Sequence, residues 1–194
     1  MKREAKILLL ADNIWLFGEG MFGPLLAVFA QKIGGDILQI TWAWATYLVV
    51  QGVLAIIIGR YFDRLKNEAS KEMLMIIGFI LNAIFTFGYI FVHSTSSLLL
   101  VEVGLGVAAA LATPTWDALY AMDTGDSNNK GISWGLEDGL SQISTGLAIV
   151  VGGFVVSLFS FNILFVVMGV FQVIATIVQF RILKLKPRPI SSQQ

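Results

Sequence analysis

The 194-residue chain contains no cysteine and few charged residues, and each absence excludes a class of protein. Without cysteine there is no disulfide framework. Charged residues make up only 13% and AVILMFWYC residues 56%, which excludes an intrinsically disordered chain. A soluble domain of this length has no core large enough for so much apolar surface, since about 45–50% is usual even when glycine is counted. The composition therefore indicates an integral membrane protein.

The groups that do chemistry in enzymes are also scarce. With no cysteine and one isolated histidine, His93, the sequence offers no nucleophile–base arrangement, so we do not expect an enzyme. It shows no metal-ligand spacing, no cofactor motif and no nucleic-acid-binding module. The expected partners are the lipid bilayer and a small-molecule substrate.

Six apolar segments are long enough to cross a bilayer, which takes about 20 residues for each span. They leave only short loops, so we predict an all-α membrane protein with one six-helix domain over residues 1–185 and a basic, polar tail at 186–194. The first half of the fifth segment is too polar to face lipid and is expected to be buried or to line water. The predicted spans are 7–30, 37–61, 72–92, 97–121, 131–157 and 161–183.

The positions of lysine and arginine predict the orientation of these spans. Of the 13 Lys and Arg residues, Lys32 alone falls on one side of the predicted membrane. By the positive-inside rule we expect both termini to be cytoplasmic, in the inner or plasma membrane of the cell. The residues on the cytoplasmic side are Lys2, Arg3, Lys6, Arg60, Arg64, Lys66, Lys71, Lys130, Arg181, Lys184, Lys186 and Arg188.

The junction between the second and third spans carries a short motif. Gly59 is followed four residues later by Asp63-Arg64, a pattern that resembles the loop signature of the major facilitator superfamily (MFS). Small residues at 104–109 in the fourth span and Lys130-Gly131 before the fifth resemble the same family. The resemblance covers the whole chain and implies one six-helix half of an MFS transporter, made of two inverted three-helix repeats.

The chain also departs from the family pattern. Lys66-Asn67-Glu68 stands where the loop signature usually continues with a glycine and two basic residues, and Leu100 replaces an arginine linked to proton coupling. Ala148-Ile149 stands where antiporters of the family carry Gly-Pro. The largest departure is size, because family members normally have twelve spans in two halves, with the transport path between them.

A single half would expose intramembrane carboxylates to lipid, at a cost of several kcal/mol each. We therefore expect a parallel homodimer, because the basic residues share one side, with alternating access at its interface. Two alternatives stay open, namely pairing with a different six-span chain and a non-transporting scaffold or receptor of the same fold. Proton coupling is a further hypothesis, and the substrate is not specified. The carboxylates concerned are Asp12, Glu19, Glu102, Asp117, Glu137 and Asp138.

The resemblance also implies a gate built on Gly59, Asp63, Arg64 and Asp123. Asp63 is expected to meet the N-terminal end of the fifth helix of the partner, where free N–H groups and the helix dipole favour an anion. Arg64 is expected to pair with Asp123 or Asp117 of its own chain. The alternative is a solvated basic loop that only fixes the topology.

Depth and helical spacing select candidates for a substrate or proton cavity. Glu19, at the middle of the first span, is the first candidate for a titrating carboxylate, and Asp138 is the second. The alternative role for these groups is hydrogen bonding between helices or at the dimer interface. The full set of cavity candidates is Asp12, Glu19, Gln51, Thr113, Trp116, Asp117, Asp138 and Gln142.

Other residues are expected to hold the helices together. Asn82 and Gln172, in the middle of the third and sixth spans, are expected to bond to each other or to backbone rather than to contact substrate. Glycines of the fifth span are expected to permit close contact between helices. These glycines are Gly135, Gly146, Gly152 and Gly153.

Overall fold

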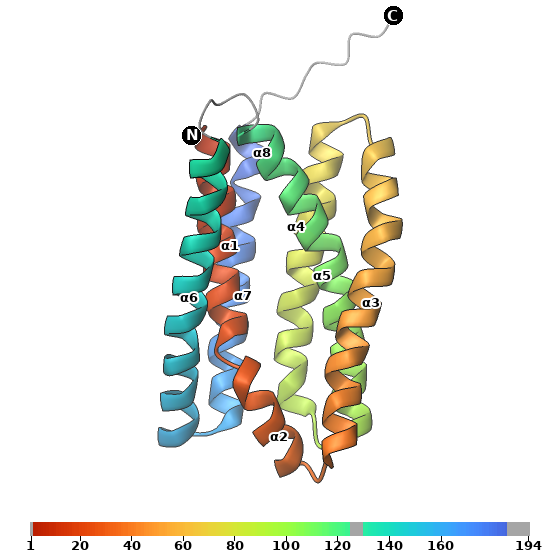
Figure 1. The fold of residues 1–194 in the computed structure, drawn as a ribbon, viewed down its shortest axis with the longest axis vertical. Helices are drawn as coiled ribbons and strands as arrows, with labels where there is room; N and C mark the ends of the chain where they lie inside the picture. Colours follow the sequence, from red (N-terminus) through yellow and green to blue (C-terminus); the bar gives the residue numbers. More distant parts are fainter. Residues whose placement is uncertain (1, 125–129, 186–194) are drawn as a thin grey trace, which may run out of the picture.

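The computed structural model describes residues 2–124 and 130–185, and within these ranges the chain is helical with no strand (Figure 1). Six helical stretches in this part are long and apolar enough to cross a membrane, which confirms the predicted number of spans. Most spans begin or end a few residues beyond the predicted limits. The elements are α1 (Arg3–Gly20), η1 (Gly23–Leu25), α2 (Leu26–Lys32), α3 (Ile37–Arg64), α4 (Glu68–Gly88), η2 (Tyr89–Phe91), α5 (Thr95–Thr124), α6 (Lys130–Leu158), α7 (Phe161–Phe180) and α8 (Ile182–Leu185).

The first span, predicted over 7–30, is broken near Gly23-Pro24. The α-helix ends at Gly20, a short 3₁₀ turn with Pro24 follows, and α2 continues in a different direction (Figure 1). Proline has no N–H to give to the preceding turn, and its ring crowds the carbonyl four residues earlier. The backbone N–H of Phe22 instead bonds to the carbonyl of Glu19 at 3.1 Å.

Side-chain caps explain where several helices begin. Asp36 caps α3 by accepting a 2.8 Å hydrogen bond from the backbone N–H of Gln39, whose side chain bonds back to the Asp36 N–H. Asn67 and Ser160 cap α4 and α7 in the same way. Gly34, with φ of 86°, makes the turn before α3 in a conformation that other residues rarely adopt. The turns predicted from polar residues therefore lie where the helices are capped.

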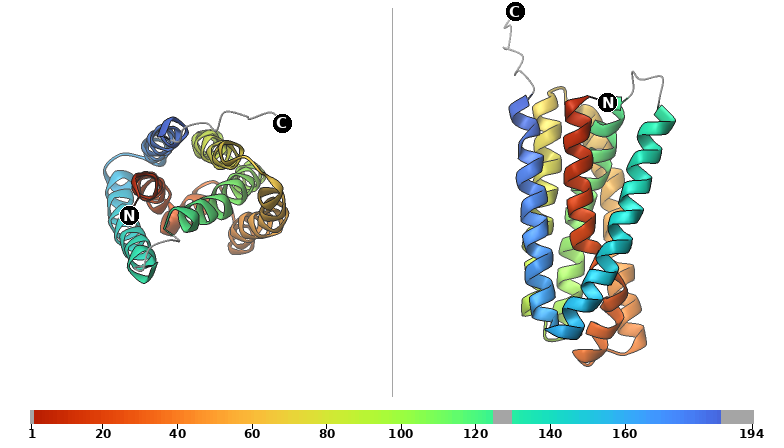
Figure 2. Two further views of the ribbon diagram at one scale, coloured as in Figure 1. Left: turned by 90° about the horizontal axis from the view of Figure 1, so that it is seen from above. Right: turned by 90° about the vertical axis from the view of Figure 1, so that its left-hand side faces the viewer.

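The helices form two groups of three that join mainly along one contact (Figure 2). In one group α1 packs against α6 and α7, and in the other α5 packs against α3 and α4. The helices α4 and α7 pack against each other and connect the groups. The helices α1 and α5, one from each group, therefore lie on either side of the interior of the bundle.

Two glycines allow α5 to come unusually close to its neighbours. A Cβ atom on Gly78 of α4 would lie 2.6 Å from the backbone nitrogen of Ala112. A Cβ atom on Gly106 of α5 would lie 2.8 Å from the backbone oxygen of Tyr47 in α3. Small residues at such crossings let helix backbones approach within a membrane. The second contact brings Tyr47 to the interior face of α5.

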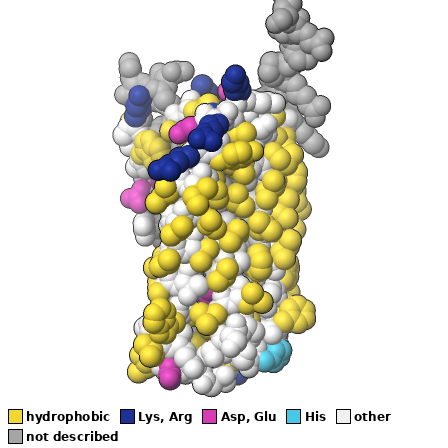
Figure 3. Space-filling model, turned by 90° about the vertical axis from the view of Figure 1, so that its right-hand side faces the viewer, with side chains coloured by type: hydrophobic (Ala, Val, Ile, Leu, Met, Phe, Trp, Pro, Cys, Tyr) yellow, Lys and Arg dark blue, Asp and Glu magenta, His cyan; other side chains and the backbone are white. Residues whose placement is uncertain are grey.

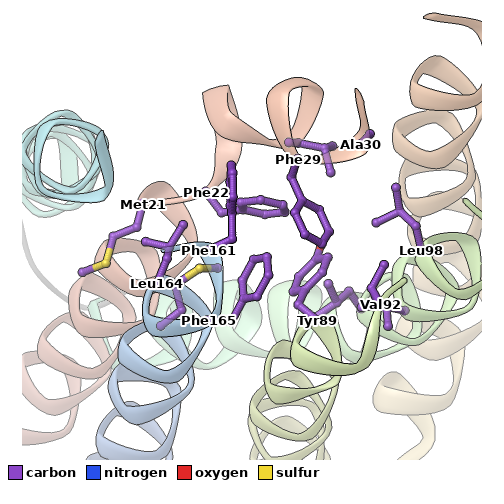
Figure 4. Packing of buried hydrophobic residues seen from close by; sticks show 14 of the residues in the cluster. Met21, Phe22, Phe29, Ala30, Tyr89, Val92, Leu98, Phe161, Leu164 and Phe165 are labelled. Carbon is purple, nitrogen blue, oxygen red and sulfur yellow. The ribbon is translucent and has the colours of Figure 1, made fainter. Parts of the chain in front are cut away.

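One end of the bundle carries most of the charge, and we call it the basic end. The helix α1 begins there, α3 and α7 end there, and exposed cations such as Arg60 and Arg64 lie there (Figure 3). Lys32 lies at the opposite end, which we call the far end. Aromatic rings fill the core toward the far end, where Phe22, Phe29 and Phe165 meet in edge-on contacts (Figure 4).

The helices α3 and α6 are the least covered parts of the bundle. Within α3 only Ala43 and Phe62 are buried, and within α6 only Ser133, Ala148 and Gly152. Their remaining surface includes many large apolar side chains. These two helices flank the interior faces of α1 and α5, and much of their surface is available to lipid or to a second protein unit.

Candidate functional site

Two small cavities lie between α1 and α5, and carboxylates line both. The first, which we call the Glu19 cavity, has a volume of about 90 Å³ and also contains Glu102 of α5 in its wall. The second, which we call the Asp12 cavity, measures about 150 Å³ and contains Asp117 and Glu137. Asp12 lies seven residues before Glu19 on α1, so the Asp12 cavity is about 10 Å nearer the basic end. None of the described residues that line either cavity is Lys, Arg or His.

In the Glu19 cavity each carboxylate accepts one hydrogen bond from a neutral donor of the third span. Asn82 Nδ2 donates to Glu19 Oε1 at 2.8 Å, and the Tyr89 hydroxyl donates to Glu102 Oε1 at 2.8 Å. Asn82 is completely buried, and Glu102 is 2% exposed. Both carboxylates are therefore fixed in place, and neither is paired with a positive charge in the cavity.

The spacing of residues on the third span explains why one helix serves both carboxylates. Asn82, Thr86 and Tyr89 lie four and three residues apart, so they follow one face of the helix. That face points between α1 and α5, where Thr86 and Tyr89 line the Glu19 cavity. Thr86 also donates a 3.3 Å hydrogen bond to the side-chain oxygen of Asn82, which leaves the Asn82 amide to donate to Glu19.

Aromatic side chains complete the Glu19 cavity. Trp44 and Tyr47 of α3 have ring centres 5.8 Å apart, and Phe22 meets Tyr89 edge-on at 4.8 Å. All four rings line the cavity, together with aliphatic side chains. The cavity therefore combines one buried and one half-buried carboxylate with aromatic rings.

The Asp12 cavity is held by an aromatic stack on α5. Trp116 lies parallel to Tyr120 with ring centres 4.9 Å apart. The Trp116 indole N–H donates to the Leu8 carbonyl of α1 at 3.2 Å, and the Tyr120 hydroxyl donates to the Ser133 carbonyl of α6 at 2.8 Å. The stack thus ties α5 to both other helices that contribute carboxylates to this cavity.

Asp12 is 8% exposed, whereas Asp117 is exposed and Glu137 is half-buried. Ser141 donates a 3.1 Å hydrogen bond to Glu137, one turn further along α6. A polar contact also joins α6 to α1, because Ser144 donates to the side-chain oxygen of Asn13 at 2.7 Å. The face of α6 that meets α1 is therefore polar, as the sequence predicts for the first half of this span.

The comparisons with known proteins agree with this architecture. The family model described as the Major Facilitator Superfamily matches residues 8–194. The chain belongs to the major facilitator superfamily. It is also 21% identical, over 165 residues, to an uncharacterized MFS-type transporter of Methanocaldococcus jannaschii. That match covers 85% of this chain and 42% of the relative, so the chain spans less than half the length of this MFS protein.

Five of the residues selected from the sequence line the two cavities of this MFS unit. They are Asp12, Glu19, Thr113, Trp116 and Asp117. Three other selected residues line neither cavity. Asp138 and Gln142 are exposed on α6, and Gln51 is half-buried on α3.

The sequence reasoning left Glu137 and Glu102 out of the cavity set. The sequence does indicate that Glu137 faces the other helices. It lies on one face of α6 together with small residues, which are those at 133, 141, 144, 148 and 152. Glu102 lies eleven residues, about three helical turns, before the selected Thr113, so the same reasoning places it on the face of that candidate. Its position in a cavity depends on the donor Tyr89, which comes from another helix.

The hydrogen bonds of Asn82 and Gln172 differ partly from expectation. Gln172 donates to the Trp15 carbonyl at 3.1 Å, which is one of the expected backbone contacts. Asn82 donates instead to the side chain of Glu19, rather than to Gln172 or to backbone as expected. The reason is the rotation of the third span, which turns Asn82 toward α1 rather than toward α7.

The MFS loop signature lies at the basic end. Asp63 and Arg64 are exposed at the end of α3, Gly59 is half-buried one turn earlier, and Asp123 is half-buried near the end of α5. The predicted cytoplasmic tail at 186–194, with Lys186 and Arg188, lies outside the described residues.

The glycines of α6 fall into two kinds. A Cβ atom on Gly152 would collide with the Met21 carbonyl, where the first span breaks. Nothing lies within 4 Å of the Cβ position at Gly135, Gly146 or Gly153. Within this unit only Gly152 serves a close helix contact, and the other three glycines leave open space on the outer side of α6.

Proposed function

We propose that this chain is a six-helix unit of an MFS transporter, and that it works with a second such unit by alternating access. The observation that carries the proposal is the pair of carboxylate-lined cavities between α1 and α5. A membrane protein that served only as a scaffold would gain nothing from carboxylates buried at mid-membrane depth, where they are costly. The unit would lie with both termini on the cytoplasmic side, since the basic end carries the cations.

Internal symmetry of the packing supports the same fold. Exchanging α1 with α5, α3 with α6 and α4 with α7 converts each close helix pair into another close pair. The pair α1–α6 becomes α5–α3, and α1–α7 becomes α5–α4. Such a pattern is what two inverted three-helix repeats would produce. We infer that spans one to three and four to six are these repeats.

The exposed surfaces of α3 and α6 support a second unit. Asp117 and Asp138 are exposed at membrane depth, and a carboxylate facing lipid there costs about 3 kcal/mol on insertion scales. A second unit facing them would enclose these groups in a protein or water-filled environment. We propose a parallel homodimer, in which α3 of one unit lies near α6 of the other, and pairing with a different six-span chain is the second candidate.

The cavity carboxylates also make proton coupling part of the proposal. Glu19 lies at the middle of the first span and is held by a neutral amide, so it can exchange a proton without breaking an ion pair. We propose that a proton moves through Glu19 or Asp12 as the unit alternates.

Uptake into proteoliposomes tests this function. Radiolabelled candidate substrates are added with and without an imposed pH gradient, and the wild type is compared with Glu19→Gln. We expect uptake by the wild type that responds to the gradient, and loss of that response in the variant. Binding of ligands without any uptake, in membranes that contain assembled protein, would favour a receptor of the same fold and contradict transport.

A further inference from the structure

The Glu19 cavity has chemistry that points to the class of its ligand. We infer that the Glu19 cavity binds a compact organic cation, a small molecule that carries an ammonium group. We also infer that such cations are the substrates of this chain, and this second statement rests on the transport function proposed above. Three features of the cavity support the ligand class: carboxylates without a positive partner in the lining, aromatic walls, and a lining that lacks the oxygen ligands that metal ions need.

The two carboxylates of the cavity can accept further hydrogen bonds from a ligand. Glu19 and Glu102 each accept one hydrogen bond of 2.8 Å, from Asn82 and Tyr89, and both donors are neutral. A carboxylate has about four acceptor positions, so capacity remains for a further donor on each group. Burial of an anion without a nearby positive charge is unfavourable. A ligand with a positive charge would compensate the carboxylates, because the described lining of the cavity contains no Lys, Arg or His.

Aromatic rings line the cavity and can attract a cation. Phe22, Trp44, Tyr47 and Tyr89 come from the first, second and third spans and surround the same space. Ring faces attract a cation within about 6 Å, and aromatic cages are the usual means of recognising quaternary ammonium groups. A bare proton gains nothing from such walls, whereas an ammonium ion with carbon substituents contacts both the rings and the carboxylates.

The remaining lining separates an organic cation from a metal ion. Leu26, Leu105 and Met168 complete the wall of the cavity. Hard cations such as Ca²⁺ take six to eight oxygen ligands. Within the described part of the chain no group of three or more His, Cys, Asp or Glu side chains is placed to hold a metal ion. The volume of about 90 Å³ is small compared with drug-sized pockets of about 300 Å³ or more, so the cation is compact.

The Asp12 cavity offers similar chemistry nearer the basic end. Its wall contains Asp12, Asp117 and Glu137 together with the rings of Trp15 and Trp116. It also has no described Lys, Arg or His in its lining. A cation that leaves the Glu19 cavity toward the basic end would therefore meet a second site of the same charge and ring character.

Binding to the purified protein in dodecyl maltoside tests the inference without requiring transport. Titration calorimetry would compare tetramethylammonium and choline with 3,3-dimethylbutan-1-ol, a neutral molecule of nearly the same shape as choline. We expect the cations to bind and the neutral molecule to bind at least about tenfold more weakly, because only the charge differs. Equal binding of choline and its neutral isostere, or no binding of either cation at millimolar concentration, would overturn the inference.

Variants locate the site. Glu102→Gln and Glu19→Gln should each weaken choline binding about tenfold or more, and Tyr47→Leu about threefold or more. Glu68→Gln is the matched control, since Glu68 is exposed at the start of α4 and far from the cavity, and it should leave affinity unchanged. If a carboxylate variant fails to fold, Tyr47→Leu still tests the cavity. Undiminished binding in folded Tyr47→Leu and Glu19→Gln would contradict the assignment.

The result separates this inference from the proposed function. Cation binding that depends on Glu102 but without uptake into proteoliposomes would support the ligand class and contradict the transporter. Uptake of an anionic or neutral substrate, with no cation binding, would support the transporter and contradict the ligand class.

Discussion

At the scale of single residues, the site depends on neutral hydrogen-bond donors that fix buried acids. Asn82 and Tyr89 each hold one carboxylate of the Glu19 cavity, and neither residue lies on α1 or α5, the helices that carry the acids. Depth and helical spacing in the sequence drew attention to the acids and not to the donors. An amide buried in an apolar helix signals only that it has some partner, and the identity of the partner depends on how three helices are rotated relative to one another.

The contact between Asn82 and Glu19 can be measured directly. Asn82→Leu should lower the free energy of unfolding by about 1–3 kcal/mol, because it leaves Glu19 without its donor. The effect should shrink when Glu19 is already replaced by glutamine, and a double-mutant cycle in denaturant reports that coupling. Ser157→Ala, at an exposed position of α6, is the control and should change little. Strict additivity of the Asn82 and Glu19 changes would contradict a direct interaction.

Asp63 supports a second prediction at this scale. Because Asp63 is exposed at the end of α3 and contributes nothing to the core, Asp63→Asn should insert and fold normally. The variant should nevertheless lose alternation, since the neutral side chain no longer favours the N-terminal end of a facing helix. Proteoliposome uptake measures the loss, and Glu68→Gln, another exposed acid at the basic end, is the control. Normal uptake by Asp63→Asn would show that the loop only fixes topology.

At the scale of helices, the sequence predicts the number of spans, whereas the partner of each helix face depends on packing. Apolar length alone placed six helices, and capping residues such as Asp36 and Ser160 lie at their starts. The Gly23-Pro24 pair indicates a break in the first span, and the structure ends α1 at Gly20, just before this pair. Asp138 and Gln142, the cavity candidates on α6, are exposed within this unit, and their role as cavity residues stays a prediction.

The two adjacent glycines of α6 test the helix packing. Gly152 lies against the Met21 carbonyl, whereas the Cβ position of Gly153 is open. Gly152→Ala should destabilise the protein by about 1–3 kcal/mol, because the backbone of α1 must move away. Gly153→Ala should be neutral or slightly stabilising, because alanine favours a helix more than glycine does. Thermal unfolding in detergent compares the two, and equal melting temperatures would contradict the close contact.

At the scale of the whole molecule, the central claim is that this MFS unit works against a second unit. Residues of α1 and α5 line both cavities. The thinly covered helices α3 and α6 add residues to the Glu19 cavity and the Asp12 cavity, respectively. Exposed glycines, among them Gly52 on α3 and Gly146 on α6, leave space for a closely packed neighbour. Neither composition nor hydropathy distinguishes a surface that faces lipid from one that faces a second unit, since both are apolar.

Cysteine cross-linking in native membranes tests this claim most directly, because the chain has no cysteine of its own. Gly52 and Gln142 lie at similar depth, about 18 Å from the basic ends of α3 and α6, and α3 and α6 do not pack against each other within one unit. In the Gly52→Cys/Gln142→Cys variant we predict a covalent dimer on oxidation, while Val170→Cys, exposed on α7, stays monomeric. A double variant that remains entirely monomeric would contradict the parallel homodimer.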